Sequence, residues 1–523
     1  MNLSPQLSNS IAAAQPRSIV SVCSHLCFLC FLLFQLPFTS VGHTAEPRRP
    51  NVVFVIADDL GYGDIGCFGQ TKIRTPHIDQ LATEGMRLTQ HYSGNAVCAP
   101  SRCVLMTGKH PGHAFIRNNR STPPEGQYPI PADTVTLMKL FRDLGYATGG
   151  FGKWGLGGPE STGQPMQQGF TRWFGYYCQG VAHNHYPTYL WDNDRKFPLK
   201  NPELSAHQKL PPGADVNDPA SYAKYTGTQF AMDLITDEAV KFVRASKDRP
   251  FFLYFPTIIP HLALQVPEDS LAEYKDAFPE VPYDGGGGYL PHRTPRAAYA
   301  AMVTRMDRHV GQIVQQVKDL GLEGNTIFVF TSDNGPLYNK FAGTDEGFFN
   351  SAGGLRGRKG SLYEGGFREP TVIAWKGHIA AGSTSDRVTG FEDWIPTLLE
   401  LAGAKEKTPA GLDGISFAPT LAGQSQPSRP FLYREFPAYG GQQMARIGDW
   451  KGVRQNLMPQ AGKKAKTNAK PNLAIELYNL KTDPKESKDV AAEHADAVAR
   501  IEELMREQHV KSAEFPFPAL DAL

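Results

Sequence analysis

Three segments of the chain each contain a continuous apolar run: residues 51–57 (NVVFVIA), 251–255 (FFLYF) and 326–332 (TIFVFTS). A run without polar alternation predicts a strand that is covered on both faces, which is typical of a parallel sheet between helices. A further strand is expected near residues 146–151. Because helical patterns separate these runs, the order predicts an α/β fold with a large, mostly parallel sheet flanked by helices.

The helical patterns are those of residues 76–81, 134–144 and 299–320. The first opens at Pro76 and is expected to stop at Gly85, and the second ends at Gly145. The third carries one apolar stripe, which predicts packing on the core: Met302, Val303, Met306, Val310, Ile313, Val314, Val317 and Leu320.

The character of the chain changes after about residue 425. Short strands are expected near residues 431–435, 445–447 and 475–479, followed by an amphipathic helix that contains Val498, Ile501 and Met505. The lysine-rich residues 460–470 show no apolar pattern and are predicted to form a loop. We therefore divide the chain into a signal peptide (1–45), a catalytic domain (46–425) and a C-terminal α+β subdomain (426–523).

Composition excludes some classes of function. The 523 residues include 53 Lys and Arg against 52 Asp and Glu, so nothing in the net charge predicts nucleic-acid binding. Of the seven cysteines, Cys67, Cys98, Cys103 and Cys178 lie outside the first 45 residues. That is too few for a disulfide scaffold in a chain of this length, so the core must supply the stability.

Residues 1–45 have the pattern of a secretory signal. Arg17 precedes an apolar run over residues 19–38, and small residues follow at Ser40, Gly42 and Ala45. The pattern predicts a secreted or periplasmic protein without stable membrane insertion. An uncleaved N-terminal anchor is the alternative.

Polar side chains are expected where the predicted strands end. Asp58 and Asp59 follow residues 51–57, and Asp333 and Asn334 follow residues 326–332. Lys153 and His261 follow the other two strands. Ligands of open α/β sheets gather at the carboxyl ends of strands. Oxygen ligands suit a hard cation such as Ca²⁺, so the two acidic pairs predict a metal site.

Residues 98–108 (CAPSRCVLMTG) carry the most specific motif. Pro100 suits the first turn of a helix, and Gly108 suits its end. Cys98 would then lie at a helix N-terminus, where free N–H groups and the macrodipole favour an anion.

This segment resembles the signature of the type I sulfatases, which belong to the alkaline phosphatase superfamily. Four other segments resemble family motifs in the family's order, and the similarity spans roughly residues 50–425: residues 75–79 (TPHID), 152–154 (GKW), 355–361 (LRGRKGS) and 363–370 (YEGGFREP). The resemblance implies an arylsulfatase-type hydrolase of sulfate esters with an alkaline phosphatase-like fold.

The resemblance also implies a role for each matching residue. Cys98 would be oxidised by a formylglycine-generating enzyme, and the hydrated aldehyde would attack sulfur. Arg102 would hold that aldehyde, Lys153 and Lys359 would bind the sulfate oxygens, and His261 would protonate the leaving alcohol. The implied ligands of one Ca²⁺ are Asp58, Asp59, the modified Cys98, Asp333 and Asn334.

One position departs from the family pattern: Gly155 stands where the family has a histidine after Gly-Lys-Trp. We expect His183 or His185 to occupy the space that Gly155 leaves open and to help release sulfate. A sugar pocket could be lined by residues of the same loop and of residues 284–289, among them Tyr186, Tyr189 and Trp191.

The alcohol itself is left open, and sulfated sugars, glycosaminoglycan fragments and aryl sulfates are all compatible with the sequence. Two other functions are also left open. One is hydrolysis of phosphonate or phosphate esters, because some relatives share the cysteine motif. The other is glycan binding without catalysis, which Gly155 suggests.

Overall fold

The structure is a computed structural model that describes residues 48–338, 340–458 and 470–523. Residues 49–523 form one compact unit. The predicted signal peptide and nearly all of the predicted lysine-rich loop lie outside the described residues. The predicted boundary between residues 425 and 426 stays a prediction. No helix in the described part of the chain is long and apolar enough to cross a membrane.

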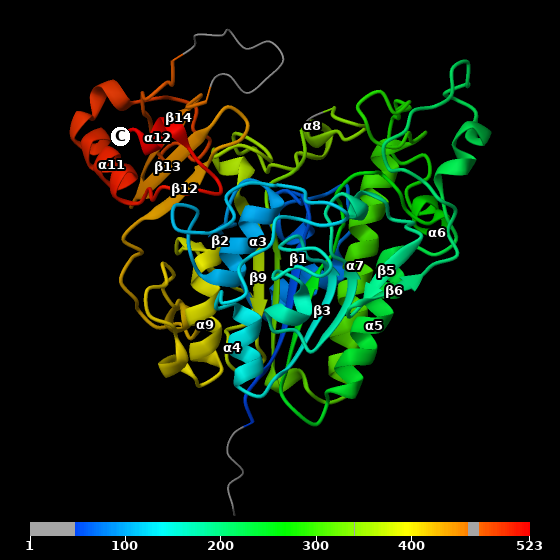
Figure 1. Cartoon of the computed structure of the whole chain (residues 1–523), viewed down its shortest axis with the longest axis horizontal. Coiled ribbons are helices and arrows are strands. Elements are labelled where there is room, and N and C mark those ends of the chain that lie inside the picture. The colour runs from blue at the N-terminus through cyan, green and yellow to red at the C-terminus, as the bar shows by residue number, and fades with distance from the viewer. Residues whose placement is uncertain (1–47, 339, 459–469) are drawn as a thin grey trace, which may run out of the picture. The chain divides into compact units, whose positions relative to one another are not determined.

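An eleven-stranded mixed sheet forms the centre of this unit (Figure 1). Its order is β10-β2-β9-β8-β1-β7-β3-β4-β5-β6, with β11 also paired to β2. The central strands are β8 (Thr326–Ser332), β1 (Asn51–Ala57), β7 (Phe251–Pro256) and β3 (Ala147–Lys153). They are parallel to one another. This confirms the predicted fold class and the expected strands.

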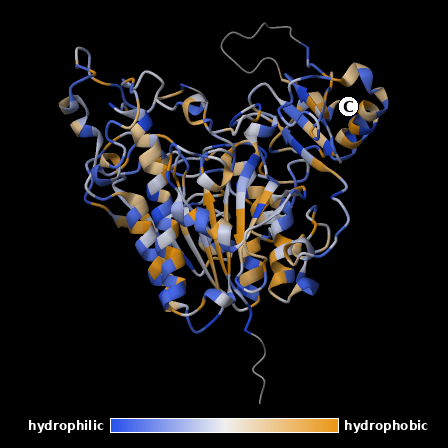
Figure 2. Ribbon diagram, turned by 180° about the vertical axis from the view of Figure 1, so that it is seen from behind, coloured by the Kyte–Doolittle hydropathy of each residue, from blue (hydrophilic) through white to orange (hydrophobic). Residues whose placement is uncertain are grey.

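The faces of the sheet are covered by two different sets of helices, so successive residues of β1 enter different cores. Val53, Val55 and Ala57 pack with α2 (Pro76–Glu84), α5 (Ala231–Ala245) and α7 (Pro295–Asp319). Val52, Phe54 and Ile56 pack with α3 (Cys98–Thr107), α4 (Leu137–Asp143) and α9 (Trp394–Leu401). Apolar strands inside a shell of mixed helices are visible in Figure 2.

The expected helices form, with shifted ends. The stripe on α7 is buried or packed against the core, as predicted. Helix α4 starts later than residue 134 because the side chain of Thr136 accepts a hydrogen bond from the backbone N–H of Lys139 and caps it. Further short helices are α6 (Glu268–Ala272), α8 (Glu346–Phe349), α10 (Ala418–Leu421) and α12 (Pro518–Asp521).

Several strands were not expected from the sequence. They are β2 (Met86–Tyr92), β4 (Arg172–Tyr176), β5 (Tyr189–Asp192), β6 (Arg195–Pro198), β9 (Arg368–Ala374), β10 (Ser383–Ser385) and β11 (Thr389–Gly390). Strand β9 is antiparallel to both β2 and β8 and contains Pro370. Pro370 is tolerated because it lies where the register with β2 shifts, so no ladder hydrogen bond is lost there.

The C-terminal part holds an antiparallel sheet in the order β12-β13-β14-β15. Its strands are β12 (Leu432–Phe436), β13 (Gln442–Ile447), β14 (Trp450–Gln455) and β15 (Glu476–Asn479). Helix α11 (Ala495–Glu507) packs Ile501 and Met505 against this sheet. The sequence predicted three of these strands and the helix, and it missed β14.

Candidate active site

Four neighbouring strands deliver the predicted site residues to one edge of the large sheet. Strand β8 leads into Asp333, β1 into Asp58, β3 ends at Lys153, and β7 is followed by His261 after a short loop. Because these strands are adjacent and parallel, their carboxyl ends meet at the same edge. Residues that lie far apart in the sequence are therefore brought together.

Cys98 is the first residue of α3, and its preceding residue Val97 is extended. The helix ends at Gly108, which has φ of 65°, as the sequence predicted. The Cys98 Sγ lies 3.3 Å from Asp58 Oδ1 and 3.6 Å from the Nζ of Lys359. Burial raises the pKa of this thiol, and the negative charge of Asp58 adds to the effect. An unmodified Cys98 is therefore a poor nucleophile, because the reactive form is the thiolate.

Three carboxylates surround Cys98. One ligand atom from each of Asp58, Asp59, Cys98 and Asp333 lies within 4.8 Å of the others. Burial and the charge of Asp58 raise the pKa of Asp333 to about 6. Packing three buried carboxylates together is unfavourable unless positive charge is supplied.

The acceptor atoms of this group fit a hard cation. The Oδ1 of Asn334 is buried and has no hydrogen-bond partner in the described part of the chain. Its Nδ2 donates to Asp59 Oδ1 at 2.7 Å, which fixes the amide. Asp59 has φ of 64°, an uncommon conformation for a residue with a side chain. Carboxylate and amide oxygens are the ligands that Ca²⁺ prefers, so the predicted set suits that ion.

Each carboxylate is paired with one buried cation. Lys359 Nζ lies 2.6 and 2.8 Å from the two oxygens of Asp59. Arg102 contacts Asp333 at 2.8 and 2.9 Å, and Lys153 forms an ion pair with Asp58. Burial alone would raise the pKa of Asp58, but Lys153, His261, Arg102 and Lys359 outweigh it and hold that pKa well below its usual range.

His261 completes the cluster. Its Nε2 lies 3.5 Å from Asp59 Oδ2, and its Nδ1 lies 2.7 Å from the carbonyl oxygen of Leu262. A carbonyl only accepts, so Nδ1 carries a hydrogen and Nε2 is the nitrogen that faces the cluster. Burial and the charge of Lys359 lower the pKa of His261. All the predicted site residues are thus brought together; their roles stay predictions.

The expectation for Gly155 is corrected by the structure. A Cβ at Gly155 would lie 2.9 Å from Nε2 and 3.3 Å from Cγ of Gln179, so Gln179 fills the space beside it. The Gln179 Nε2 is buried and has no hydrogen-bond partner in the described part of the chain. The φ of 84° at Gly155 also disfavours any side chain there.

The two histidines proposed for that space lie elsewhere. His185 is buried, and its Nε2 donates to the backbone carbonyl of His261 at 3.0 Å. It therefore stabilises the loop that carries His261. His183 stacks on the ring of His261, with centroids 4.8 Å apart. Tyr289 lies near both, whereas Trp191 donates to Glu125 at 2.9 Å and Tyr186 packs on Phe230.

Two further residues near the cluster were given no role from the sequence. Glu369 is buried, accepts a hydrogen bond from the hydroxyl of Ser93 at 3.2 Å, and has its pKa raised by burial and by Asp333. His207 contacts His183 through their ring nitrogens at 3.1 Å. Glu369 lies in the YEGGFREP motif, but a lone loop histidine such as His207 carries no sequence signal.

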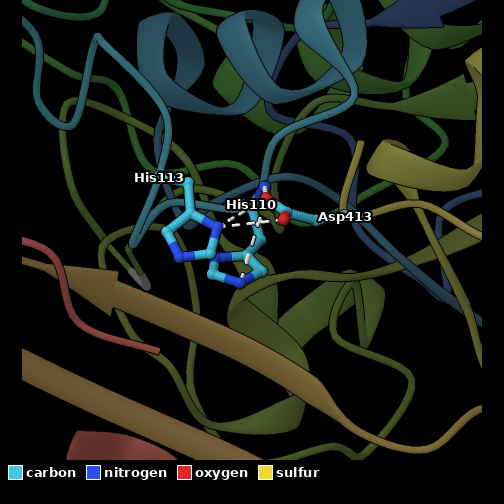
Figure 3. A group of neighbouring side chains, drawn as sticks. All are labelled: His110, His113 and Asp413. Atoms are coloured by element: carbon cyan, nitrogen blue, oxygen red, sulfur yellow. Dashed lines mark hydrogen bonds and ion pairs between the residues drawn. The ribbon is translucent and has the colours of Figure 1, made fainter. Parts of the chain in front are cut away.

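A second cluster of potential ligands consists of His110, His113 and Asp413 (Figure 3). His113 Nδ1 lies 2.9 Å from Asp413 Oδ1. The two imidazole rings are stacked, with centroids 4.2 Å apart and 29° between planes. The nitrogen lone pairs of two stacked imidazole rings lie in nearly parallel planes. They therefore do not point at one metal ion about 2 Å from both nitrogens.

Hydrogen bonding also opposes a metal at this second cluster. His110 Nδ1 accepts from the backbone N–H of Gly112 at 3.2 Å, so Nε2 keeps its hydrogen and faces Gln508 Oε1 at 3.1 Å. We interpret the cluster as a hydrogen-bonded contact that fixes the loop after α3 to the segment around Asp413.

Comparison with known proteins agrees with this geometry. A family model described as Sulfatase matches residues 50–404, and one described as N-sulphoglucosamine sulphohydrolase, C-terminal, matches residues 358–513. Arylsulfatase A of Homo sapiens is 31% identical over 495 residues, which cover 90% of this chain and 89% of that protein. N-acetylgalactosamine-6-sulfatase of Mus musculus is 31% identical over 414 residues, covering 77% and 72%.

A solved structure of Ps i-CgsB in complex with k-i-k-neocarrahexaose has a TM-score of 0.72 and 26% identity. The match covers 91% of this chain and 96% of the Ps i-CgsB chain. The fold is therefore the alkaline phosphatase-like α/β fold that the sequence resemblance implied.

Proposed function

The chain belongs to the sulfatase family and is a sulfuric ester hydrolase, and we propose that it releases sulfate from a sulfated carbohydrate by means of formylglycine at position 98 and one Ca²⁺. The observation that carries this proposal is the convergence of Lys153, Lys359 and Arg102 on three carboxylates around one buried cysteine. A relative named for N-acetylgalactosamine 6-sulfate and a neighbour bound to a neocarrahexaose support a sugar substrate.

The charges of the site support an anionic substrate group together with a divalent cation. Asp58, Asp59 and Asp333 contribute three negative charges when ionised, and Arg102, Lys153 and Lys359 contribute three positive ones. The protein side chains are therefore close to neutral. Adding Ca²⁺ and a singly charged sulfate ester leaves the sum within about one charge of zero, so neither ion is buried uncompensated.

Formylglycine and Ca²⁺ would have distinct tasks. Formylglycine would supply the nucleophile, and Ca²⁺, held by Asp58, Asp59, Asp333 and Asn334, would draw negative charge from the sulfate oxygens. The raised pKa of the Cys98 thiol supports the need for modification, since the thiol would stay protonated.

Lys153 and Lys359 are proposed to bind the sulfate oxygens, where negative charge spreads as the ester bond breaks. They already lie at the cluster and are buried, so their charge is little screened by water. Arg102 is held by Asp333 and by the carbonyl of Lys153 at 2.7 Å. These contacts fix the guanidinium of Arg102, which is proposed to hold the hydrated aldehyde at position 98.

His261 is proposed to protonate the leaving alcohol through Nε2. In the free protein, burial and Lys359 favour its neutral form. A bound sulfate ester places a negative charge between the lysines and His261, and an adjacent negative charge favours the protonated ring. The proton is therefore favoured on His261 when substrate is bound, which is when an acid is needed.

Maturation and location are part of the proposal. A formylglycine-generating enzyme is expected to act on Cys98, and the N-terminal signal pattern predicts secretion or a periplasmic location. N-terminal sequencing of the mature protein checks cleavage within residues 40–46, and an intact N-terminus would favour an anchor.

The function is tested by mass spectrometry of the peptide that contains Cys98, combined with turnover of 4-nitrophenyl sulfate and 4-nitrophenyl phenylphosphonate. We expect formylglycine at position 98, Ca²⁺-dependent turnover and a preference for the sulfate ester. Unmodified cysteine in active protein would contradict the nucleophile. Faster turnover of the phosphonate would indicate a phosphonate or phosphate ester hydrolase. Absence of all turnover in protein that carries formylglycine would indicate glycan binding without catalysis.

A further inference from the structure

The ring of His183 borders the active site without taking part in the carboxylate cluster. It is half-buried at the end of the 3₁₀ turn Val181–His183 and lies nearly parallel to the ring of His261, with 11° between planes. The ring of Tyr289 lies 5.4 Å from His183 and 6.3 Å from His261, centroid to centroid. The rings of His183 and Tyr289 therefore adjoin His261, the histidine that is proposed to protonate the leaving alcohol.

A chain of hydrogen bonds fixes which nitrogen of His183 carries the hydrogen. His207 Nδ1 lies 2.6 Å from the carbonyl oxygen of Gly288, so Nδ1 donates. In neutral His207, Nε2 is then an acceptor, and it faces His183 Nδ1 at 3.1 Å. His183 Nδ1 therefore donates, and the other nitrogen of His183, Nε2, presents a lone pair.

This lone pair is not used within the described part of the chain. No described residue forms a hydrogen bond with His183 Nε2. Burial, together with the nearby positive charges of His261 and Lys153, lowers the pKa of His183, so the ring is neutral. The cations of the site suit the sulfate group. Nε2 of His183 only accepts a hydrogen bond, and a sulfate oxygen has no hydrogen to donate, so Nε2 suits a hydroxyl group instead.

We propose that His183 Nε2 accepts a hydrogen bond from a hydroxyl group of the leaving alcohol, so that the His207–His183 pair and Tyr289 select a polyhydroxylated sugar sulfate over a simple aryl sulfate. This rests on the proposed function, because it places the leaving alcohol beside His261. A sugar offers hydroxyls next to the sulfated carbon and an apolar ring face for Tyr289. A simple aryl sulfate offers no such hydroxyl.

The test measures binding rather than turnover. A Cys98→Ala protein has no side-chain thiol or hydroxyl to oxidise, so Kd values are measured in this background by calorimetry with Ca²⁺ present. The ligands are the positional isomers of monosulfated galactose and N-acetylglucosamine, mono-deoxy analogues of the tightest binder, and inorganic sulfate. Two changes are added to this background. His183→Phe keeps an aromatic ring without the acceptor, and His183→Gln restores an acceptor oxygen without the ring.

We expect His183→Phe to weaken binding of the best sugar sulfate about 5- to 20-fold, which is the effect of one lost hydrogen bond. His183→Gln should recover part of this loss, and inorganic sulfate should bind all three proteins within about twofold. One deoxy analogue should bind the parent as weakly as the full sugar binds the Phe variant, and the Phe change should not weaken it further.

Three results would overturn the inference. The first is equal weakening of sugar sulfate and inorganic sulfate, which would place His183 in support of the anion site. The second is unchanged sugar binding in His183→Phe. The third is a panel in which no sugar binds the parent more tightly than inorganic sulfate does. Absence of turnover in converted wild-type protein would contradict the proposed function instead, and the binding results stay separate from it.

Discussion

The cluster around Cys98 and the cluster around Glu392 are both buried, and both are assembled from equal numbers of acids and bases. In the cluster around Glu392, Arg434 donates hydrogen bonds to both carboxylate oxygens at 3.0 and 2.9 Å, and Arg429 donates a further one at 2.7 Å. The two arginines overcome burial and lower the pKa of Glu392 to about 2. Every oxygen of Glu392 and Asp393 has a partner.

The cluster around Cys98 differs because its groups are left incompletely satisfied. Asn334 Oδ1 has no partner in the described part of the chain, Asp333 has a raised pKa, and a thiol stands between the charges. Buried charge alone therefore does not identify a binding site. The informative features are a buried acceptor atom without a partner and a carboxyl group whose pKa is raised by burial and by a neighbouring carboxylate.

The largest effect is expected from Cys98→Ala. The change removes the proposed nucleophile and no large apolar contact, so turnover should fall to background while the thermal midpoint changes by only a few degrees. Steady-state assays and calorimetry check both. Cys103→Ala in the same helix is the matched control, and it should retain activity in the protein that folds. Measurable turnover by Cys98→Ala would remove Cys98 from the mechanism.

The next largest effect concerns the metal. Asp333→Asn keeps the shape of the side chain and removes one negative charge, so bound Ca²⁺ should fall below one per chain and activity by about 10³-fold or more. Elemental analysis after dialysis measures the metal. Asp413→Asn, in the histidine-stacked cluster, should leave the Ca²⁺ content unchanged. A full complement of tightly held Ca²⁺ in Asp333→Asn would contradict the site.

Lys359→Ala should lower kcat/KM by about 10²-fold, because a buried cation that faces developing charge is lost. Lys359→Arg should recover only part, since a planar guanidinium differs from a point charge. Lys376, whose side chain is 69% exposed and pairs with Glu323, provides the control, and Lys376→Ala should stay within about twofold. Near-normal kinetics in Lys359→Ala would move the sulfate contact elsewhere.

The smallest effect on catalysis is expected from the saturated cluster. Arg434→Met leaves Glu392 with one partner fewer, so the free energy of unfolding should fall by about 3–5 kcal/mol, while kcat of the folded protein stays within about twofold. Denaturant titration measures the first quantity. Adding Glu392→Gln should restore part of the stability, because it removes the excess buried negative charge and leaves Arg429 paired with Asp393. A large loss of kcat in the folded variant would contradict a purely structural role for the cluster around Glu392.

The sequence predicted the centre of the site because strand ends are readable from local patterns. Uninterrupted apolar runs gave β1, β7 and β8, and adjacency of parallel strands then brought Asp58, Asp333 and His261 together. The same logic did not find β9, which contains Pro370 at the point where its register with β2 shifts. It also failed for β14, whose sequence WKGVRQ has no continuous apolar run.

The rim of the site was harder to predict because loops decide it. The sequence suggested that a histidine compensates for Gly155, yet Gln179 occupies that space. Nothing local shows that residue 179 crosses back over residue 155, since this depends on the pairing of β3 with β4. The contact of His183 with His207 likewise joins two loops whose approach is set by tertiary packing.

The burial of Cys98 also sets an order of events. Only 1% of this residue is accessible in the folded chain, and β1, α3 and the segment around Lys359 enclose it. An enzyme that oxidises the thiol needs the backbone around it in its own active site, which the folded protein does not offer. The proposed conversion must therefore precede closure of the sheet edge. Under the proposed conversion, maturation and folding compete in time, and a chain that folds first keeps an inaccessible Cys98 thiol.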